Sequence, residues 1–295
     1  MSLFTSRQNV LAFLAPSVIV LLVLIFIPCL YTLYLCFFEQ NAATGSQQVF
    51  IGLENFRMLL LDQEFLYSLF LLFAFITIST GLELAMGLGV ALYLDHFLPK
   101  AKKIHALLLL PMFVIPVVSG LGFRYIFDPE NGVLGSLFFR FGLEAPDILG
   151  DPFGAFALVI AQDVWRMWPF MFIIIFAGLQ IVSKEQIEAI KLDGANFFAQ
   201  CRFVILPALK PTLVVAVLLK VIESFKAFTE IFVMTGGGPG NATTILPLFI
   251  VKQIIDFREF SYGSAASFVL LSLSLIFIAV FSRLQSQSNS TKELA

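Results

Sequence analysis

Residues 188–207 read EAIKLDGANFFAQCRFVILP and separate two long apolar runs. Charged and apolar residues alternate along this stretch, and Gly194 follows Asp193. Just before it, Gln186 follows Ser183 by three residues, the spacing of a capping box at a helix start. A glycine directly after a helical run is a common helix C-cap. The stretch therefore predicts two short amphipathic helices that meet at an elbow near Gly194; the alternative is a surface loop that merely connects two spans.

The rest of the chain is strongly apolar. Of its 295 residues, 59% are hydrophobic and 13% are charged, whereas soluble domains carry about 25% charged residues. The mean hydropathy is +0.94. The net charge is −2, and no block of basic residues is present that would indicate a nucleic-acid partner. This composition is typical of a protein embedded in a lipid bilayer.

Runs of about 20 mostly apolar residues are long enough to cross a bilayer as helices. Six such runs occupy residues 11–38, 67–94, 105–127, 154–181, 205–234 and 263–283. The first run is too long for the apolar region of a signal peptide, so we expect it to remain as a span. We predict an all-α integral membrane protein with six transmembrane helices.

The distribution of Lys and Arg predicts the orientation, because short cytoplasmic loops are enriched in these residues. With a cytoplasmic N-terminus, the inner segments contain Arg7, Lys100, Lys102, Lys103, Lys184, Lys191, Arg202, Lys210, Arg283 and Lys292. The outer segments then contain Arg57, Arg124, Arg140, Lys252 and Arg258. Both termini, and the stretch 188–207, are therefore expected on the cytoplasmic side.

Signatures of common enzyme classes are missing from the sequence. It has no G-x-x-x-x-G-K-[ST] loop for nucleotide phosphates. Its histidines, His96 and His105, have no cysteine or carboxylate neighbours at metal-ligand spacing. The three cysteines do not suggest a disulfide framework. We therefore expect no catalytic residue, no metal site and no cofactor bound by this chain.

The spacing within 188–207 resembles the cytoplasmic signature of the membrane subunits of binding-protein-dependent ABC importers. That signature reads E-A-A, three residues, Gly, nine residues, I-x-L-P. The matching positions are Glu188, Ala189, Ile190, Gly194, Val204, Leu206 and Pro207, with Ile190 replacing the second Ala and Val204 replacing Ile. The resemblance implies that residues 183–202 couple to a separate ATPase subunit. The contact residues it implies are Glu188, Ala189, Ile190, Asp193, Gly194 and Ala195.

Other stretches resemble the carbohydrate, maltose-transporter-type branch of these importers. They are LPMFVIPVVSG (110–120), NGVLGSLF (131–138), and residues 148–180 and 225–250, the last containing TGGGPG. The resemblance implies the type I ABC importer permease fold. It also implies three regions: an extra span with an extracytoplasmic loop (1–64), a transmembrane core (65–284) and a cytoplasmic tail (285–295).

The same resemblance implies a set of partners. They are two ATP-binding-cassette subunits that bind ATP and Mg, a second permease subunit, an extracytoplasmic solute-binding protein and a sugar or related compound. It also implies location in a prokaryotic plasma membrane. Which sugar is carried, and whether the second permease is a copy or a paralogue, the sequence leaves open.

Polar residues inside the predicted fifth span have two interpretations, because charges in a span are costly and usually face an interior. Lys220, Glu223, Ser224 and Ala227 have the spacing of one helix face. They either line a translocation path or form pairs that hold the helices together. In maltose-type permeases this helix carries the sugar site. The resemblance places this site at Lys220, Glu223, Ser224 and Ala227. We predict a substrate path formed by these four residues together with Phe228 and Trp165.

Further charged positions are expected to pair. Asp163 and Arg166 are three residues apart and Lys226 and Glu230 four apart, both spacings that bring helical side chains together. Glu83 lies among small residues that allow close helix packing, and we expect a buried, hydrogen-bonded carboxyl there.

Two other function classes compete with the importer permease. An ion-gradient-driven transporter could use Glu83 or Glu223 as its ion site, but it would not explain the signature at 188–207. A membrane-embedded enzyme lacks a catalytic set. Trp165 and Trp168 fit either an aromatic belt at the membrane interface or a surface for stacking a sugar.

Overall fold

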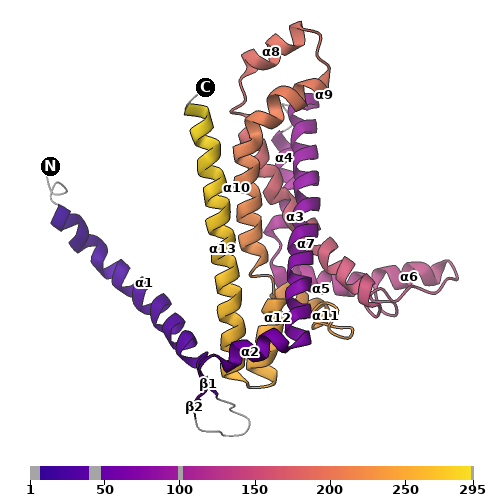
Figure 1. Cartoon of the computed structure of the whole chain (residues 1–295). Helices are drawn as coiled ribbons and strands as arrows, with labels where there is room; N and C mark the ends of the chain where they lie inside the picture. The colour runs from indigo at the N-terminus through magenta and orange to yellow at the C-terminus, as the bar shows by residue number, and fades with distance from the viewer. Residues whose placement is uncertain (1–6, 40–47, 99–101, 294–295) are drawn as a thin grey trace. The chain divides into compact units, whose positions relative to one another are not determined.

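The computed structural model describes residues 7–39, 48–98 and 102–293, with side chains in 14–39, 48–98 and 102–283 (Figure 1). The α-helices are α1 (Arg7–Leu35), α2 (Glu54–Leu61), α3 (Gln63–Phe97), α4 (Lys102–Leu108), α5 (Pro116–Ile126), α6 (Val133–Arg140), α7 (Pro152–Leu179), α8 (Lys184–Leu192), α9 (Phe197–Gln200), α10 (Leu206–Ser224), α11 (Thr229–Thr235), α12 (Leu246–Val251) and α13 (Phe260–Glu293). One 3₁₀ helix, η1 (Leu110–Phe113), two π-helical turns, η2 (Cys201–Ile205) and η3 (Lys252–Asp256), and two strands, β1 (Phe38–Glu39) and β2 (Val49–Phe50), complete the described elements.

The chain forms two compact units. Unit 1 contains residues 1–66 and 249–272, and unit 2 contains residues 67–248 and 273–295. The sequence-based division at residues 64 and 284 stays a prediction, since compact packing alone does not test it. Most of the stretch expected as a tail belongs to α13, whose backbone is helical to Glu293.

Unit 1 is organised around a short antiparallel hairpin. Phe38 of β1 lies opposite Phe50 of β2, and their rings contact edge to face with centroids 5.4 Å apart. The buried Asn55 of α2 donates hydrogen bonds to the carbonyls of Cys36 (2.8 Å) and Phe38 (2.9 Å). This amide satisfies two backbone acceptors and fixes α2 against the end of α1 and the start of β1.

The core of unit 2 is formed by facing residues of α3, α7 and α10. Met171 and Ile175 of α7 and Leu209 of α10 are fully buried within it. A Cβ atom on Gly87 of α3 would lie only 2.7 Å from Cβ of Met171 and 2.8 Å from the backbone nitrogen of Phe172. The missing side chain at Gly87 therefore lets the backbones of α3 and α7 approach closely, as small residues do in membrane helix pairs.

Five helices of the described chain are long and apolar enough to cross a membrane. They cover Leu14–Leu35, Gln63–Phe97, Pro152–Leu179, Phe197–Ser224 and Phe260–Arg283. These spans confirm the predicted all-α membrane fold and coincide with five of the six expected runs.

The sixth expected run, 105–127, is not one continuous helix. It is divided into α4, η1 and α5, with breaks beside Pro111 and Pro116. Ile115, which precedes Pro116, is extended, with ψ of 138°. A proline lacks the backbone N–H that a continuous helix needs and disfavours helical geometry in the residue before it. Apolar composition alone therefore overestimated the length of this helix.

The expected run 205–234 also has a break. The helix α10 ends at Ser224, and α11 begins at Thr229. Ala227 and Phe228 lie in the connection, so the expectation that Ala227 continues the polar face of α10 is wrong. After α11, Gly236 and Gly237 adopt left-handed backbone conformations, with φ of +62° and +94°, which turn the chain into the TGGGPG loop.

Candidate functional site

The segment that carries the signature begins and ends as its sequence predicts. The hydroxyl of Ser183 accepts a hydrogen bond from the backbone N–H of Gln186 (3.3 Å), which caps the start of α8. At the other end, the N–H of Ala195 donates to the carbonyl of Ile190 (3.1 Å). The backbone of Gly194 is left-handed, with φ of +83°. This arrangement is a Schellman cap, and it makes the elbow between α8 and α9.

A second cap and a wide turn join this elbow to the following span. The side chain of Asn196 accepts from the N–H of Ala199 (2.9 Å) at the start of α9. The π-helical turn η2 follows directly and leads into α10. Pro207, in the first turn of α10, has no N–H for the α-helical bond to Phe203, which favours a widened turn at this point. Cys201 and Ile205 of η2 belong to the core of unit 2, so the turn is anchored.

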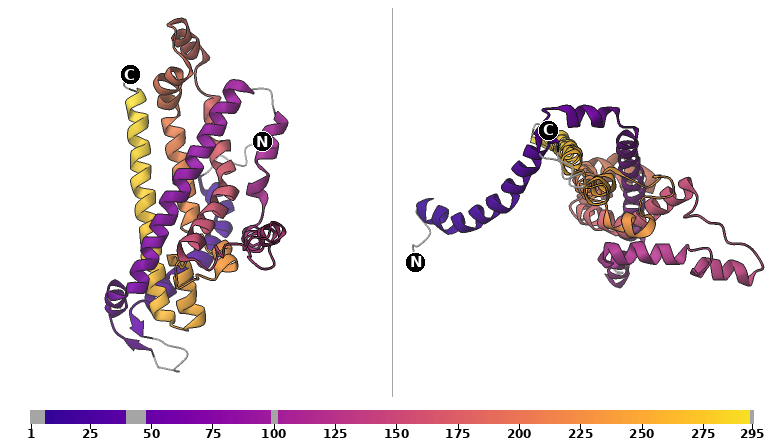
Figure 2. Two further views of the ribbon diagram at one scale, coloured as in Figure 1. Left: turned by 90° about the vertical axis from the view of Figure 1, so that its right-hand side faces the viewer. Right: turned by 90° about the horizontal axis from the view of Figure 1, so that it is seen from below.

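The elbow itself is accessible. The helices α8 and α9 lie at one end of unit 2, away from α11 at the other (Figure 1, Figure 2). No residue of α8 is buried. The apolar side chains of Leu192 and Phe198 are 89% and 83% exposed. Of the six predicted contact residues, Glu188, Ala189, Asp193 and Gly194 are exposed, and Ile190 and Ala195 are half-buried. The elbow therefore presents charged and large apolar side chains together on its surface.

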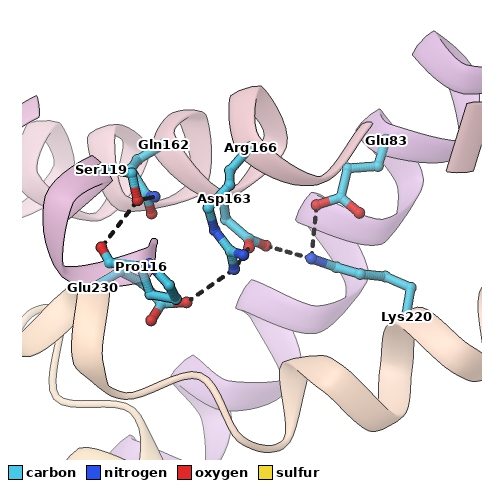
Figure 3. Close-up of polar contacts among 8 residues, drawn as sticks. All are labelled: Glu83, Pro116, Ser119, Gln162, Asp163, Arg166, Lys220 and Glu230. Carbon is cyan, nitrogen blue, oxygen red and sulfur yellow. Dashed lines mark hydrogen bonds and ion pairs between the residues drawn. The ribbon is translucent and has the colours of Figure 1, made fainter. Parts of the chain in front are cut away.

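A cluster of ionic side chains lies inside unit 2, centred on Lys220 of α10 (Figure 3). Its ammonium Nζ lies 2.8 Å from Oε1 of Glu83 on α3 and 2.7 Å from Oδ2 of Asp163 on α7. All three side chains are nearly or fully buried. The predicted burial of Glu83 is confirmed, and its partner, which the sequence did not identify, is Lys220.

The cluster continues through Arg166 of α7. Its guanidinium Nη2 lies 3.8 Å from Oδ1 of Asp163 and 3.4 Å from Oε1 of Glu230 on α11. The predicted pairing of Asp163 with Arg166 is confirmed. The predicted pairing of Lys226 with Glu230 is wrong, because the helix ends at Ser224; Lys226 instead pairs with Glu223 at the surface, at 2.9 Å.

The charges in this cluster nearly balance. Three carboxylates (Glu83, Asp163 and Glu230) meet two cations (Lys220 and Arg166). A buried charge is tolerated when it is paired and becomes costly when its partner is removed. The cluster therefore ties four helices of unit 2 together, as the bundle-holding interpretation of Lys220 predicts. The role of Lys220 in a substrate path stays a prediction.

A small polar cavity borders this cluster. Its volume is about 140 Å³, and the residues around it include Asp163, Lys220, Ser224, Ala227 and Glu230. The hydroxyl of Ser224 is buried and has no hydrogen-bond partner among the described residues. Ligand pockets usually measure about 300–1,000 Å³, so this cavity is smaller than a typical ligand site.

The other predicted path residues are distributed more widely. Glu223 borders the same cavity but is exposed. Phe228 stacks on Phe232, with ring centroids 5.4 Å apart. Trp165 packs against Phe123 (5.6 Å) and borders a separate apolar groove rather than the polar cavity. The structure therefore brings Lys220, Ser224 and Ala227 together and leaves Trp165 apart from them.

Sequence reasoning missed the pairing of Arg166 with Glu230 and the place of Asp163 beside Lys220. Each of these contacts joins residues from different helices. Helical periodicity places neighbours on one helix, and it carries no information on which helices face each other. A charge inside a span is costly unless another group pairs with it, and the sequence indicated only in this way that such partners exist.

Comparisons with known proteins agree with these features. Residues 104–289 match the family described as "Binding-protein-dependent transport system inner membrane component". The chain is 32% identical over 266 residues to the trehalose/maltose transport system permease protein MalF of Thermococcus litoralis, covering 90% of each chain. It is also 32% identical over 271 residues to the sulfoquinovosyl glycerol transport system permease protein SmoG of Agrobacterium fabrum, covering 92% of this chain and 88% of the relative.

Solved structures share the fold. A chain of a bacterial ABC transporter involved in the import of the acidic polysaccharide alginate matches with a TM-score of 0.82 at 18% identity, covering 95% of this chain and 96% of that one. A bacterial alginate ABC transporter in complex with an alginate pentasaccharide-bound periplasmic protein matches with a TM-score of 0.80, also at 18% identity, covering 95% and 94%.

Proposed function

This chain belongs to the family of binding-protein-dependent transport system inner membrane components, and we propose that it carries a sugar or a related polyol or glycoside across the membrane. It is a membrane-embedded permease subunit of an ABC importer and not an enzyme. The sugar class follows from the relatives, whose names include trehalose, maltose and sulfoquinovosyl glycerol. The proposal concerns that class and the way in which this subunit takes part in transport.

The coupling of transport to ATP is assigned to the segment 183–202. In this proposal two partner subunits bind ATP and Mg. Each of these ATPase subunits has a groove that receives the elbow of one permease subunit. The observation that supports this most strongly is the Schellman cap at Gly194, which presents α8 in exposed form on an anchored base. Movement of the ATPase subunits would then be transmitted through η2 to α10.

A second permease subunit completes the path. The polar cavity of about 140 Å³ in this chain is smaller than the usual ligand pocket of about 300–1,000 Å³, and its lining residues lie on α5, α7, α10 and α11 and in the connection between α10 and α11. A facing copy or paralogue would supply the rest of the site. Alternating access then moves the site between the two sides of the membrane.

The remaining partners follow from the same proposal. A solute-binding protein delivers the sugar on the extracytoplasmic side, as the alginate relative's complex with a periplasmic protein suggests. The elbow must face the cytoplasm if it meets an ATPase, which agrees with the distribution of Lys and Arg. Both termini would then be cytoplasmic, in the plasma membrane of a prokaryote.

An ion-gradient-driven carrier is less well supported. Glu83, its best candidate ion site, already holds an ammonium group at 2.8 Å. Its competitor for an ion role, Glu223, is exposed and paired with Lys226. Each carboxylate therefore already has a lysine ammonium as its partner.

The test of this function is affinity purification of the chain from its native membrane in mild detergent, followed by reconstitution in liposomes. We expect a P-loop ATPase and a second permease to co-purify, and uptake of a sugar to require both ATP and the binding protein. Uptake that persists without ATP and disappears when an uncoupler dissipates the ion gradient would contradict the proposal.

A further inference from the structure

Residues at the ends of three spans meet in unit 1. Glu39 follows the first span, Asp62 directly precedes α3, Glu259 precedes α13, and Ser261 and Tyr262 lie in the first turn of α13. A helix that crosses the membrane places its two ends on opposite sides. If the elbow at Gly194 faces the cytoplasm, α10 ends on the extracytoplasmic side and α13 begins there, together with Asp62, which contacts Tyr262 in the first turn of α13.

These residues line a pocket of about 420 Å³. Its lining consists of Glu39, Asn55, Met58, Asp62, Gln253, Glu259, Ser261 and Tyr262, so it contains three carboxylates and, among the described residues, no cationic side chain. All of these residues belong to unit 1. The pocket is therefore a strongly acidic feature of one compact unit.

One of the three carboxylates is held within the pocket wall. The hydroxyl of Tyr262 donates to Oδ2 of Asp62 at 2.5 Å, and the backbone N–H of Glu64 donates to Oδ1 at 2.8 Å. Both oxygens of Asp62 are therefore engaged, and the side chain fixes the start of α13 to the start of α3.

Other polar side chains in the pocket lack partners within the described part of the chain. Within the described part of the chain, Glu39 and Glu259 form no ion pair. Ser261 is only 3% exposed, and its hydroxyl has no hydrogen-bond partner there. Gln253, 8% exposed, makes no side-chain hydrogen bond to described residues. A buried polar group without a partner is costly, so Ser261 and Gln253 point to a ligand that supplies donors. Glu39, which is exposed, and Glu259, which is half-buried, add negative charge to the same pocket.

The negative charge of the pocket limits which chemical class of ligand it can bind. A divalent metal ion is not favoured, because no group of three His, Cys, Asp or Glu side chains in the described chain could hold one. An acidic sugar would be repelled. A neutral sugar could donate hydroxyl hydrogens but would leave the carboxylate charges uncompensated. An ammonium or guanidinium group offers several donors and a positive charge, and it forms the strongest hydrogen bonds with carboxylates.

We propose that this pocket receives a lysine or arginine side chain of the extracytoplasmic solute-binding protein when that protein docks on the permease. Glu39 and Glu259 would pair with the cationic group, and Ser261 and Gln253 would accept its remaining hydrogen bonds. The inference rests on the proposed function, since it needs a binding protein as partner and an extracytoplasmic position for this end of the chain.

The test uses the complete transporter in liposomes, with its own purified binding protein, and the substitutions Glu39→Gln and Glu259→Gln singly and together. These changes keep the shape of each side chain and remove its charge. The matched control is Glu54→Gln, because Glu54 lies on neighbouring α2, pairs with Arg57 and does not line the pocket. The measured quantity is the concentration of binding protein that gives half-maximal ATP-driven uptake, at low and high salt.

We expect this concentration to rise about tenfold in the double variant, with the maximal rate unchanged, because removing one side of an interfacial charge pair slows docking or speeds release. Added salt should weaken wild-type docking and have less effect on the double variant. The control should match wild type.

Unchanged half-saturation in the double variant would overturn the inference, and so would an equal change in the Glu54→Gln control. A change in the half-saturating sugar concentration, with docking intact, would assign the pocket to the sugar instead and would likewise overturn it. If the wild-type complex shows no uptake that depends on ATP and the binding protein, it is the proposed function that fails.

Discussion

The ammonium of Lys220 lies 2.8 Å from a carboxylate oxygen of Glu83, with both side chains removed from solvent. This contact joins α10, which leads directly from the elbow segment, to α3. Because Asp163 lies on the other side of the same ammonium, at 2.7 Å, three helices of unit 2 meet at one positive charge. The stability of the unit should therefore depend on this charge far more than on the charges at its surface.

Replacement of Lys220 by methionine should destabilise the protein strongly. The substitution keeps the volume and removes the charge, leaving two buried carboxylates without their shared cation. Loss of one partner of a buried pair costs about 3–5 kcal/mol. Thermal unfolding in detergent, followed by size-exclusion chromatography, measures the effect. The matched control is Lys226→Met, since the Lys226 side chain is 64% exposed and should tolerate the change. Equal midpoints for the two variants would contradict the role of the buried cluster.

Replacement of Glu223 by alanine tests whether this residue contributes to transport without contributing to stability. The Glu223 side chain is 52% exposed and pairs with Lys226 at the surface, a type of ion pair worth about 0–1 kcal/mol. We expect normal unfolding and assembly. If Glu223 lines the path together with the cavity beside it, the half-saturating sugar concentration should change severalfold. Normal uptake kinetics together with normal stability would remove Glu223 from the path.

Replacement of Gly194 by proline should release the ATPase. Gly194 combines a φ of +83° with an N–H that donates to the carbonyl of Lys191 at 3.0 Å. Proline can provide neither. The variant should reach the membrane, and the amount of co-purified ATPase should fall at least about tenfold, in keeping with the loss of a docking surface.

Gly142→Pro is the control for this experiment. Gly142 also has a left-handed backbone, with φ of +68°, and its N–H donates to Phe139 at 3.0 Å. It follows α6, far along the chain from the elbow. ATPase recovery that drops equally in both variants would mean that any disturbed turn uncouples the complex.

Replacement of Gly87 by alanine tests the close contact of α3 with α7. The new methyl group would lie 2.7 Å from Cβ of Met171, so one helix must move. Overpacking of this kind costs about 1–3 kcal/mol. Gly89→Ala, two residues further along the same helix, meets no atom within 4 Å and should be neutral or stabilising by up to about 1 kcal/mol. Unfolding midpoints of the two variants, measured side by side, decide whether the contact is as tight as described.

Local features of this chain were predictable from its sequence. Ser183 and Gly194 predicted the two ends of α8 because capping depends on residues only a few positions apart. Long apolar runs predicted five spans for the same reason: their signal is contained in the run itself. The helix breaks at Pro116 and after Ser224 were not predicted, because the apolar composition that identifies a span continues through both.

Contacts between helices were not predictable in the same way. Nothing in the neighbourhood of Glu83 specifies Lys220, and nothing near Arg166 specifies Glu230. Such partners are decided by how whole helices pack, and a single sequence states only that an isolated charge in a span needs compensation. The acidic pocket in unit 1 was missed for a related reason, because its residues come from two distant parts of the chain.

The π-helical turn η2 sets the angle, measured about the helix axis, between the residues of α9 and those of α10. One residue of an α-helix turns the chain by about 100°, so a widened turn offsets the faces on its two sides by about that amount. Deleting a single residue such as Val204 would remove the extra residue of this turn. The apolar faces of α10 could keep their packing, while Glu188 and Leu192 would point in a different direction around the helix axis. The direction in which this subunit presents its elbow is therefore decided by the count of residues in one turn.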